Sequence, residues 1–373
     1  MKKLTAVLLS VLIVFQCAAA LCEEPVVDRN RNSLTLIDQQ DRNITPKTQK
    51  QKKVKNGISI LTGEKSKESY QPVLVEINNE NGGIFSVAPE GITQATILYE
   101  YQVYTNGTTG LCALFQDELP TSVGPIGNAS VGGVLIQNDW KCGYVFNNIP
   151  TNQDGTVSEL GYSIQMWLQS NNLVDGQQIF PASASKVKDW KKYFRADESM
   201  IIDQNQFVDV TGIKKLLTQN KNKAVDIPYL FNAEIKEEDT DSIPVREIDI
   251  RLPSRAFSSG FVYNPNDHKY YRWIGDNNQY GDVTADKQLT VSNLIIQRVN
   301  YSTSNGLMAP ITIGIGNADI FTKGTYIEGY WIRESADDHT RFYDSEGNLV
   351  ELYPGNTFIS MMTNSTSVVI LNY

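Results

Sequence analysis

The 373-residue sequence predicts an α+β protein with two domains behind an N-terminal export signal. Two observations favour this fold class: strand-like and helical stretches alternate before residue 232, and short β-branched or aromatic runs follow one another after residue 246. The composition is 41% hydrophobic and 20% charged, which is enough apolar material to bury sizeable cores. At roughly 150 residues per domain, the length also fits about two domains.

Residues 1–20 have the layout of a secretory signal peptide. A positive MKK precedes the apolar run Leu4–Phe15, and Ala18–Ala20 provide small residues for cleavage. The run is shorter than the roughly 20 apolar residues of a membrane span, so we expect no transmembrane span in the mature chain. The pattern predicts an extracytoplasmic protein. It is either secreted or anchored to the outer face of the cytoplasmic membrane through a lipid on Cys17, although Gln16 departs from the small residue that lipidation favours.

A polar tether, residues 21–57, leads into an expected N-terminal α/β-type domain at 58–232. In chain order we expect strands at 71–79, 95–104, 111–116 and 141–148, and helices at 131–139, 157–173 and 207–221. Within the second helix, Leu160, Ile164 and Leu168 fall at helical spacing, and Ser158 is its expected N-cap.

An acidic linker at 233–245, closed by Pro244, separates this domain from a C-terminal β-rich domain at 246–373. There the expected strands lie at 247–252, 258–264, 269–275, 288–299, 311–316, 324–333, 339–344 and 358–362. Their short lengths and intervening turn signals predict a mostly antiparallel arrangement. The segment GIGNADIF at 314–321 lacks the third glycine of a dinucleotide fingerprint and is interpreted as a tight turn.

The net charge of −9 and the pI of about 4.9 argue against binding of nucleic acid. Cys112 and Cys142 are interpreted either as a disulfide of an oxidising compartment or as two buried free thiols. Two cysteines alone do not make a zinc site, and His268 and His339 stand apart in separate turns. We therefore expect neither a metal nor another cofactor.

The densest polar and aromatic cluster lies around a predicted hairpin of the C-terminal domain. It consists of Tyr270, Tyr271, Arg272, Trp273, Asp276 and Asp282. Aromatic rings beside carboxylates suit binding of a sugar ring, and Asp276 and Asp282 are candidates for glycosidic acid/base work. The alternative is a hairpin with packed aromatic side chains and a polar turn.

The glycine-rich stretch GPIGNASVGG at 124–133 lacks the lysine of a P-loop. It is interpreted as a strand-to-helix turn in which Pro125 sets the entry and Asn128 or Ser130 caps the next segment.

Several motifs in order resemble the YerB-like family of lipoproteins of unknown function, over residues 58–370. They are LTGE…YQPVLVEINN, GITQATILYEYQV and LCALFQDELPTSVGPIGNAS, followed by FVYNPNDHKYYRWIGDNNQYGDV, IGNADIFTKGTYIEGYWIR and TRFYDSEGNLVELYPGNTFISMM. The resemblance implies an envelope lipoprotein with no established reaction. The family's loop usually reads GPVRSAR, so Gly127 and Ser130 stand where it has arginines. If the relatives bind an anionic ligand at this loop, the resemblance implies that the site is lost or altered here, because neither glycine nor serine forms a guanidinium fork.

The leading interpretation is therefore a two-domain envelope protein without catalytic activity that binds a wall polymer or another envelope protein. The alternative is an enzyme that processes a cell-wall glycan or a lipid-linked phosphate precursor, with Asp276 and Asp282 as its acid and base.

Overall fold

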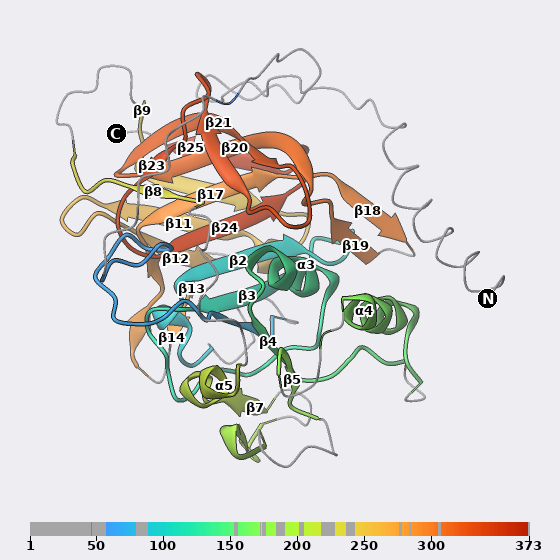
Figure 1. The fold of residues 1–373 in the computed structure, drawn as a ribbon. Coiled ribbons are helices and arrows are strands. Elements are labelled where there is room, and N and C mark those ends of the chain that lie inside the picture. The colour runs from blue at the N-terminus through green and yellow to red at the C-terminus, as the bar shows by residue number, and fades with distance from the viewer. Residues whose placement is uncertain are drawn as a thin grey trace.

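The structure is a computed structural model of the chain. It describes residues 46, 57–79, 89–152, 156–171, 173, 177–183, 191–200, 205–217, 228–235, 243–275, 278–282, 285–304 and 307–371. Within these residues the protein is α+β, with a large mixed sheet, a smaller antiparallel sheet and three α-helices (Figure 1). The predicted signal peptide, Cys17 and nearly all of the tether lie outside the described residues, as does 236–242 of the acidic linker.

The mixed sheet contains strands from both halves of the sequence. Its spatial order is β22 (Arg341–Asp344), β21 (Thr325–Arg333), β20 (Gly314–Thr322), β17 (Asn293–Arg298), β24 (Thr357–Met362), β2 (Ile97–Gln102), β3 (Thr109–Phe115), β1 (Val73–Ile77), β4 (Gly143–Phe146) and β5 (Ile179–Pro181), with β9 (Ile243–Pro244) paired to β21. Strand β24 runs parallel to both β2 and β17, so Ser360 lies opposite Glu100 on one side and Ile296 on the other. The part of the chain before residue 236 and the part after residue 242, here the N-terminal and C-terminal parts, therefore share one continuous sheet.

The central strands of this sheet are buried on both faces. Strands β1, β2 and β24 have no exposed position, in keeping with their nearly continuous apolar sequences. A single glutamate interrupts the apolar run in each of β1 and β2, at Glu76 and Glu100. Since a charged side chain is rarely buried without partners, both positions need hydrogen-bonding neighbours inside the protein.

The smaller sheet is antiparallel throughout and packs one of its faces on the mixed sheet. Its strands are β13 (Asn278–Gln279), β12 (Lys269–Ile274), β11 (Ser259–Asn264), β10 (Glu247–Arg251) and β25 (Ser367–Leu371), with β16 (Thr290–Val291) also paired to β12. Burial alternates along β11 and β12, as a sheet with one buried face requires. The ring centroids of Phe261 and Phe358 lie 5.2 Å apart across the interface. The predicted mostly antiparallel character of the C-terminal part is confirmed.

Three helices cover the mixed sheet. They are α3 (Val131–Trp140), α4 (Glu159–Ser170) and α5 (Val210–Leu216). Helices α3 and α4 lie side by side and pack into the core on one face of the sheet, whereas α5 belongs to the core on the other face (Figure 1). The predicted N-cap Ser158 is confirmed, because its hydroxyl accepts the Gly161 N–H. The expected helix at 207–221 begins only at Val210, where the Asp209 carboxylate caps it, because the residues just before it form a strand.

The remaining described elements are short 3-10 helices and strands. They are η1 (Ile92–Gln94), η2 (Lys191–Tyr193), η3 (Arg255–Phe257), β6 (Phe194–Ala196), β7 (Gln206–Val208), β8 (Leu230–Phe231), β14 (Gly281–Asp282), β15 (Lys287–Gln288), β18 (Tyr301–Ser304), β19 (Leu307–Pro310) and β23 (Glu351–Leu352). None of the helices in the described part of the chain combines the length and the apolar character needed to cross a membrane.

The tight turn expected at 314–321 is wrong, because these residues form most of the nine-residue strand β20. The glycine at 316 has a packing role: a Cβ there would lie 2.4 Å from Nε1 of Trp331, on the neighbouring strand β21. That indole nitrogen donates to the Arg298 carbonyl at 2.7 Å. Glycine at position 316 therefore leaves room for the Trp331 ring to pack over β20. The two glycines at 314 and 316 reflect this packing and not a turn.

Candidate functional site

Strand geometry divides the predicted aromatic and carboxylate cluster. Along β12, Tyr270 and Arg272 point into the core and are fully buried, whereas Tyr271 and Trp273 lie on the opposite, partly exposed face. The Tyr271 hydroxyl donates to Asp267 at 2.6 Å. The cluster is therefore not one continuous platform, and among its described members Tyr271 and Trp273 are the two that are partly exposed.

The candidate acid/base residue Asp282 is buried and bound to the backbone. One of its carboxylate oxygens accepts the N–H of Gly91 at 2.5 Å, and the other accepts the N–H of Ala285 at 2.9 Å. Asp282 lies on β14, opposite Lys287 in the register, so it connects the C-terminal part to the chain entering η1. The second candidate, Asp276, lies outside the described residues.

Arg272 forms a buried ion pair with Glu100 across the two parts of the chain. Both side chains are 0% exposed, and Nη2 of Arg272 lies 3.1 Å from Oε1 of Glu100. The hydroxyls of Thr109 and Ser259 also donate to this carboxylate, at 3.2 Å each. Burial raises the pKa of Glu100, and the nearby guanidinium opposes that rise. Arg272, predicted as a binding residue, thus joins β12 to β2 inside the core.

The glycine-rich loop runs alongside the end of β1 before it enters α3. The Pro125 carbonyl accepts the Asn78 N–H at 2.9 Å, and the Gly127 N–H donates to the Glu76 carbonyl at 2.9 Å. A Cβ at Gly124 would lie 2.6 Å from the Gln206 carbonyl oxygen, so close backbone approach requires glycine there. The predicted strand-to-helix turn is confirmed, with Ser130 as the N-cap of α3.

Beneath this loop, the buried Glu76 carboxylate accepts four hydrogen bonds from uncharged side chains. The Ser130 and Tyr144 hydroxyls donate to Oε1 at 2.6 and 2.5 Å, and the Tyr101 hydroxyl and the Cys112 thiol donate to Oε2 at 3.0 and 3.1 Å. Burial raises the pKa of Glu76, although all four hydrogen bonds lower it.

Glu76 places a negative group at the N-terminus of α3 from inside the protein. A Cβ at Gly133, in the first turn of the helix, would lie 2.0 Å from Oε1 of Glu76, so backbone and carboxylate are in close contact. Helix N-termini attract anions because their N–H groups and the helix dipole favour negative charge. Here the Glu76 carboxyl group lies beside that end of the helix. A Cβ at Gly127, where the family resemblance expects arginine, would lie 3.0 Å from the Ile77 carbonyl oxygen, so a larger residue would need the backbone to shift.

Cys112 and Cys142 are free, buried thiols. They do not form the disulfide that was one of the two expectations, because β1 lies between their strands: β1 pairs with β3 on one side and with β4 on the other. Cys112 faces Glu76 in this register. Burial is the main cause that raises the pKa of each thiol.

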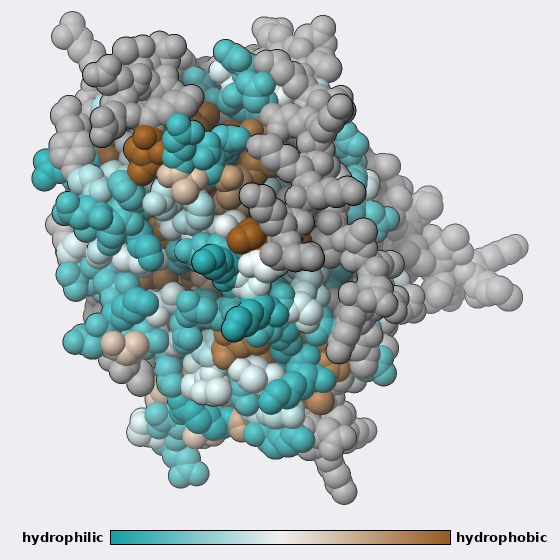
Figure 2. All heavy atoms as spheres, turned by 60° about the vertical axis from the view of Figure 1, so that its left-hand side comes forward, coloured by the Kyte–Doolittle hydropathy of each residue, from teal (hydrophilic) through white to brown (hydrophobic). Residues whose placement is uncertain are grey.

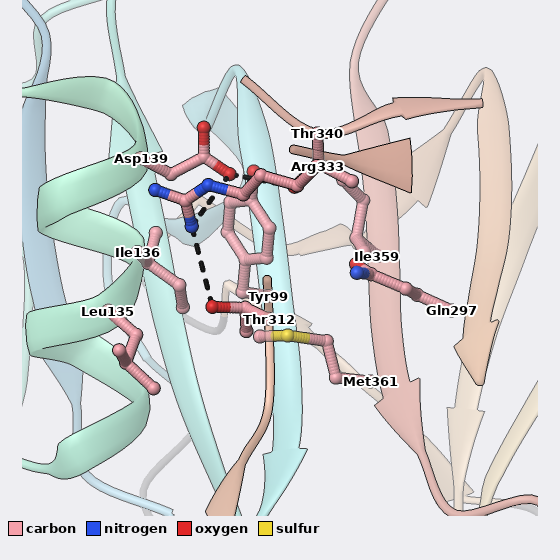
Figure 3. Close-up of a pocket in the computed structure, with 10 residues that line it drawn as sticks. All are labelled: Tyr99, Leu135, Ile136, Asp139, Gln297, Thr312, Arg333, Thr340, Ile359 and Met361. Atoms are coloured by element: carbon pink, nitrogen blue, oxygen red, sulfur yellow. Dashed lines mark hydrogen bonds and ion pairs between the residues drawn. The ribbon is translucent and has the colours of Figure 1, made fainter. Parts of the chain in front are cut away.

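A small pocket lies between α3 and the mixed sheet (Figure 3). Asp139 on α3 accepts the Thr340 hydroxyl at 2.9 Å and lies 3.7 Å from Nη1 of Arg333, which also donates to Thr312 at 3.4 Å. His339 was expected in a surface turn, but its ring stacks on Trp140 and its Nδ1 lies 3.1 Å from Asp139. Its cavity volume is only about 10 Å³, roughly the room that one water molecule needs, so we interpret it as a packing defect where α3 docks.

A larger pocket, with a cavity volume of about 110 Å³, lies where the N-terminal and C-terminal parts meet, and we call it the junction pocket. Its uncharged polar wall consists of Thr62, Thr93, Gln94, Thr96, Thr290 and Asn356. Its charged residues are Glu64, Asp117, Glu118, Lys269 and Lys287. The three carboxylates come from the N-terminal part and both lysines come from the C-terminal part, and we call these two sets of lining residues the acidic wall and the basic wall.

Hydrogen bonds connect the two walls and fix their positions. The Gly355 N–H donates to the Thr62 carbonyl at 2.8 Å, and the Thr357 N–H donates to the Thr96 carbonyl at 3.2 Å. On the basic side, the Asn356 side chain donates to the Thr290 carbonyl at 2.8 Å. These hydrogen bonds hold the backbone of the two walls together, whereas the side chains of Glu64, Glu118 and Lys287 are exposed.

Asp117 has one carboxylate oxygen that lacks a hydrogen-bond partner among the described residues. Its Oδ2 accepts the hydroxyls of Ser59 and Thr62 at 2.7 and 3.0 Å. Its Oδ1 is buried, and no hydrogen-bond partner for it exists in the described part of the chain. A buried acceptor without a partner is unfavourable, which marks this atom as a point where a ligand or a water would donate.

Sequence reasoning missed the junction pocket because its residues come from segments far apart in the chain. Only Lys269 lies beside the predicted cluster. Glu76 and Glu100 were also missed, although a lone glutamate within the apolar runs VLVEI and ILYEYQ is a usable signal of a buried polar network.

Comparisons with known proteins identify the family. The N-terminal domain model of the protein of unknown function DUF3048 matches residues 61–223, and its C-terminal domain model matches residues 248–359. A search of curated proteins finds no match. The fold is similar to the crystal structure of the YerB protein from Bacillus subtilis, with a TM-score of 0.64 and 18% sequence identity. That similarity covers 84% of this chain and 99% of the YerB chain. Since the two domain models together match most of the sequence in the expected order, the chain belongs to the YerB-like DUF3048 family of proteins of unknown function.

Proposed function

We propose that the protein is an extracytoplasmic envelope protein that binds a wall polymer in the junction pocket. The observation that supports this most strongly is the pocket itself: hydroxyl, amide and charged side chains from both parts of the chain line it. Wall polymers present hydroxyls, amides and charged groups, which such side chains recognise by hydrogen bonds and ion pairs. The signal-like N-terminus supports an extracytoplasmic location, with or without a lipid on Cys17.

The surface chemistry also favours polar recognition. The face in Figure 2 is mostly hydrophilic, and its hydrophobic residues form separate small areas. A protein partner that binds through a large apolar surface would need a continuous patch of several hundred Å². We therefore prefer a polymer to an envelope protein as the partner.

Binding without turnover is the better interpretation of the carboxylates. Glycosidic catalysis needs two carboxyl groups on either side of the bond that is cleaved. Asp282 is buried, and each of its oxygens accepts a backbone N–H, so it is poorly placed for that work. The alternative, an enzyme acting on a wall glycan or a lipid-linked phosphate precursor, is tested by incubating the protein with each material and measuring products by mass spectrometry.

Co-sedimentation with purified, insoluble wall sacculi tests the proposal. We expect the wild-type protein to sediment with the sacculi and the double variant Lys269→Glu/Lys287→Glu to bind at least about tenfold more weakly, because it reverses the basic wall. The control is Lys191→Glu/Lys215→Glu, which makes the same change of charge at two exposed lysines outside the pocket.

If the wild-type protein stays in the supernatant, or if both double variants bind equally well, the proposal is wrong. Mass spectrometry of the mature N-terminus tests the anchor separately: an acyl group on Cys17 supports anchoring, and an unmodified start after Ala20 supports secretion.

A further inference from the structure

We propose that the junction pocket selects a ligand segment that carries both an ammonium group and a carboxylate, as the peptide portion of a wall polymer does. This inference rests on the proposed function and specifies which part of the polymer is recognised. It follows from the charges that line the pocket, where the N-terminal part supplies three carboxylates and the C-terminal part supplies two lysines.

The acidic wall suits an ammonium group. Asp117 is oriented by two hydroxyl donors on Oδ2, which leaves Oδ1 buried and unpartnered within the described residues. An ammonium group carries three donors and no acceptor, so it satisfies this oxygen and retains donors for neighbouring groups. Glu64 and Glu118 line the same wall and add negative charge, which favours a cation over a neutral hydroxyl.

The basic wall suits a carboxylate. Within the part of the chain that the structure describes, Lys269 and Lys287 have no ion-pair partner, although both line one pocket. Two ammonium groups that face the same space repel each other, and an anion between them relieves that repulsion. Lysine acts as a mobile point charge without a fixed fork, so it reaches a flexible carboxylate without demanding one geometry.

The two walls together give specificity. A neutral glycan leaves both walls without counter-charges, and a purely anionic polymer is repelled by Glu64, Asp117 and Glu118. A segment with both charges satisfies both walls at once.

Calorimetric titration with a defined probe tests this inference. The probe is a disaccharide-tetrapeptide released from purified wall by a muramidase, compared with its N-acetylated form and its carboxyl-amidated form. We expect each modification to weaken binding to the wild-type protein about tenfold or more, because each removes one charge-assisted contact.

Matched variants assign each charge to its wall. The Asp117→Asn variant should bind the unmodified probe more weakly than the wild type does, and acetylation of the probe should not weaken this binding further. The Lys269→Met/Lys287→Met variant should bind the amidated and the unmodified probe equally well, but acetylation of the probe should still weaken binding. Asp337→Asn, which changes an exposed carboxylate outside the pocket, should bind like the wild type.

Equal binding of all three probe forms would overturn the inference, as would variants that respond to the wrong modification. If sacculi are retained in that case, the binding function stands and only the ligand assignment fails. If neither sacculi nor the probe bind, the proposed function itself fails.

Discussion

Replacing Arg272 with methionine should remove a main stabilising contact between the N-terminal and C-terminal parts. Both Arg272 and Glu100 are fully buried, so the substitution leaves the carboxylate without a cation in the core. Methionine retains packing against the Tyr280 and Phe358 rings, which lie 4.2 and 4.9 Å from the guanidinium carbon. Breaking a buried ion pair from one side costs about 3–5 kcal/mol, and we expect the free energy of unfolding to fall by that amount.

The double variant Glu100→Gln/Arg272→Met distinguishes the contribution of the ion pair to stability from that of side-chain packing. Nε and Nη1 of Arg272 have no hydrogen-bond partner among the described residues, so the wild-type pair is itself incompletely satisfied. Removing both charges should therefore be much less damaging than the sum of the two single substitutions. We expect a coupling energy of about 1–3 kcal/mol.

The pH dependence of the Arg272→Met variant gives a second, independent test. Burial raises the pKa of Glu100 from its ordinary value of 4.5, and loss of Arg272 raises it further. When the pKa of a carboxyl group is higher in the folded state than in the unfolded state, protonation of that group stabilises the fold. This stabilisation is fully present below the unfolded-state pKa and is lost as the pH rises through the folded-state pKa. The variant should therefore be more strongly destabilised at pH 8 than at pH 5.

Urea titration followed by tryptophan fluorescence measures all three quantities. A loss below about 1 kcal/mol, or an equal loss at both pH values, would refute the claim that an ion pair joins the two parts.

Four further predictions concern groups in or near the core. Glu76→Gln replaces an acceptor with an N–H that faces hydroxyl donors, and urea titration should show a loss of about 2–4 kcal/mol; an unchanged midpoint would contradict the arrangement of four donors. Ser130→Ala removes a helix cap and a donor to that carboxylate, so we expect a loss of about 1–3 kcal/mol, and a loss close to zero in chemical unfolding would count against it. Asp282→Ala orphans two backbone N–H groups and should lower stability by about 2–4 kcal/mol, whereas a purely catalytic aspartate would leave stability nearly unchanged. A maleimide should label Cys112 and Cys142 in urea but not in the folded protein, and rapid labelling without urea, seen by peptide mapping, would disprove their burial.

Local structure was predictable where a local pattern determines it. The apolar run that became β1 and the N-cap at Ser158 follow from side-chain burial and hydrogen bonding within a few residues. The glycines at 314–316 were misinterpreted, because Gly316 is required by Trp331 on the neighbouring strand. A single sequence shows the spacing of the glycines, but it does not show that the Trp331 ring on the neighbouring strand packs over Gly316.

The candidate site was less predictable, because it depends on contacts between distant segments. The opposite orientation of Tyr271 and Arg272 follows from the two-residue period of a strand and was available from the sequence. That Asp117 and Lys287 line the same pocket was not, because it depends on the parallel pairing of β24 with β2 and on the way the smaller sheet packs. Such long-range pairing is determined by the whole core and not by any motif.

Photocrosslinking from inside the junction pocket in intact cells tests the proposed function most directly. A benzophenone amino acid replaces Gln94, which lines the pocket, and the control places it at Lys215 on α5, outside the pocket. After irradiation, the adduct at each position is identified by mass spectrometry. Binding of a wall polymer in the pocket predicts a wall-derived fragment attached at position 94 and none at position 215. Adducts only with proteins, or equal labelling at both positions, would contradict it.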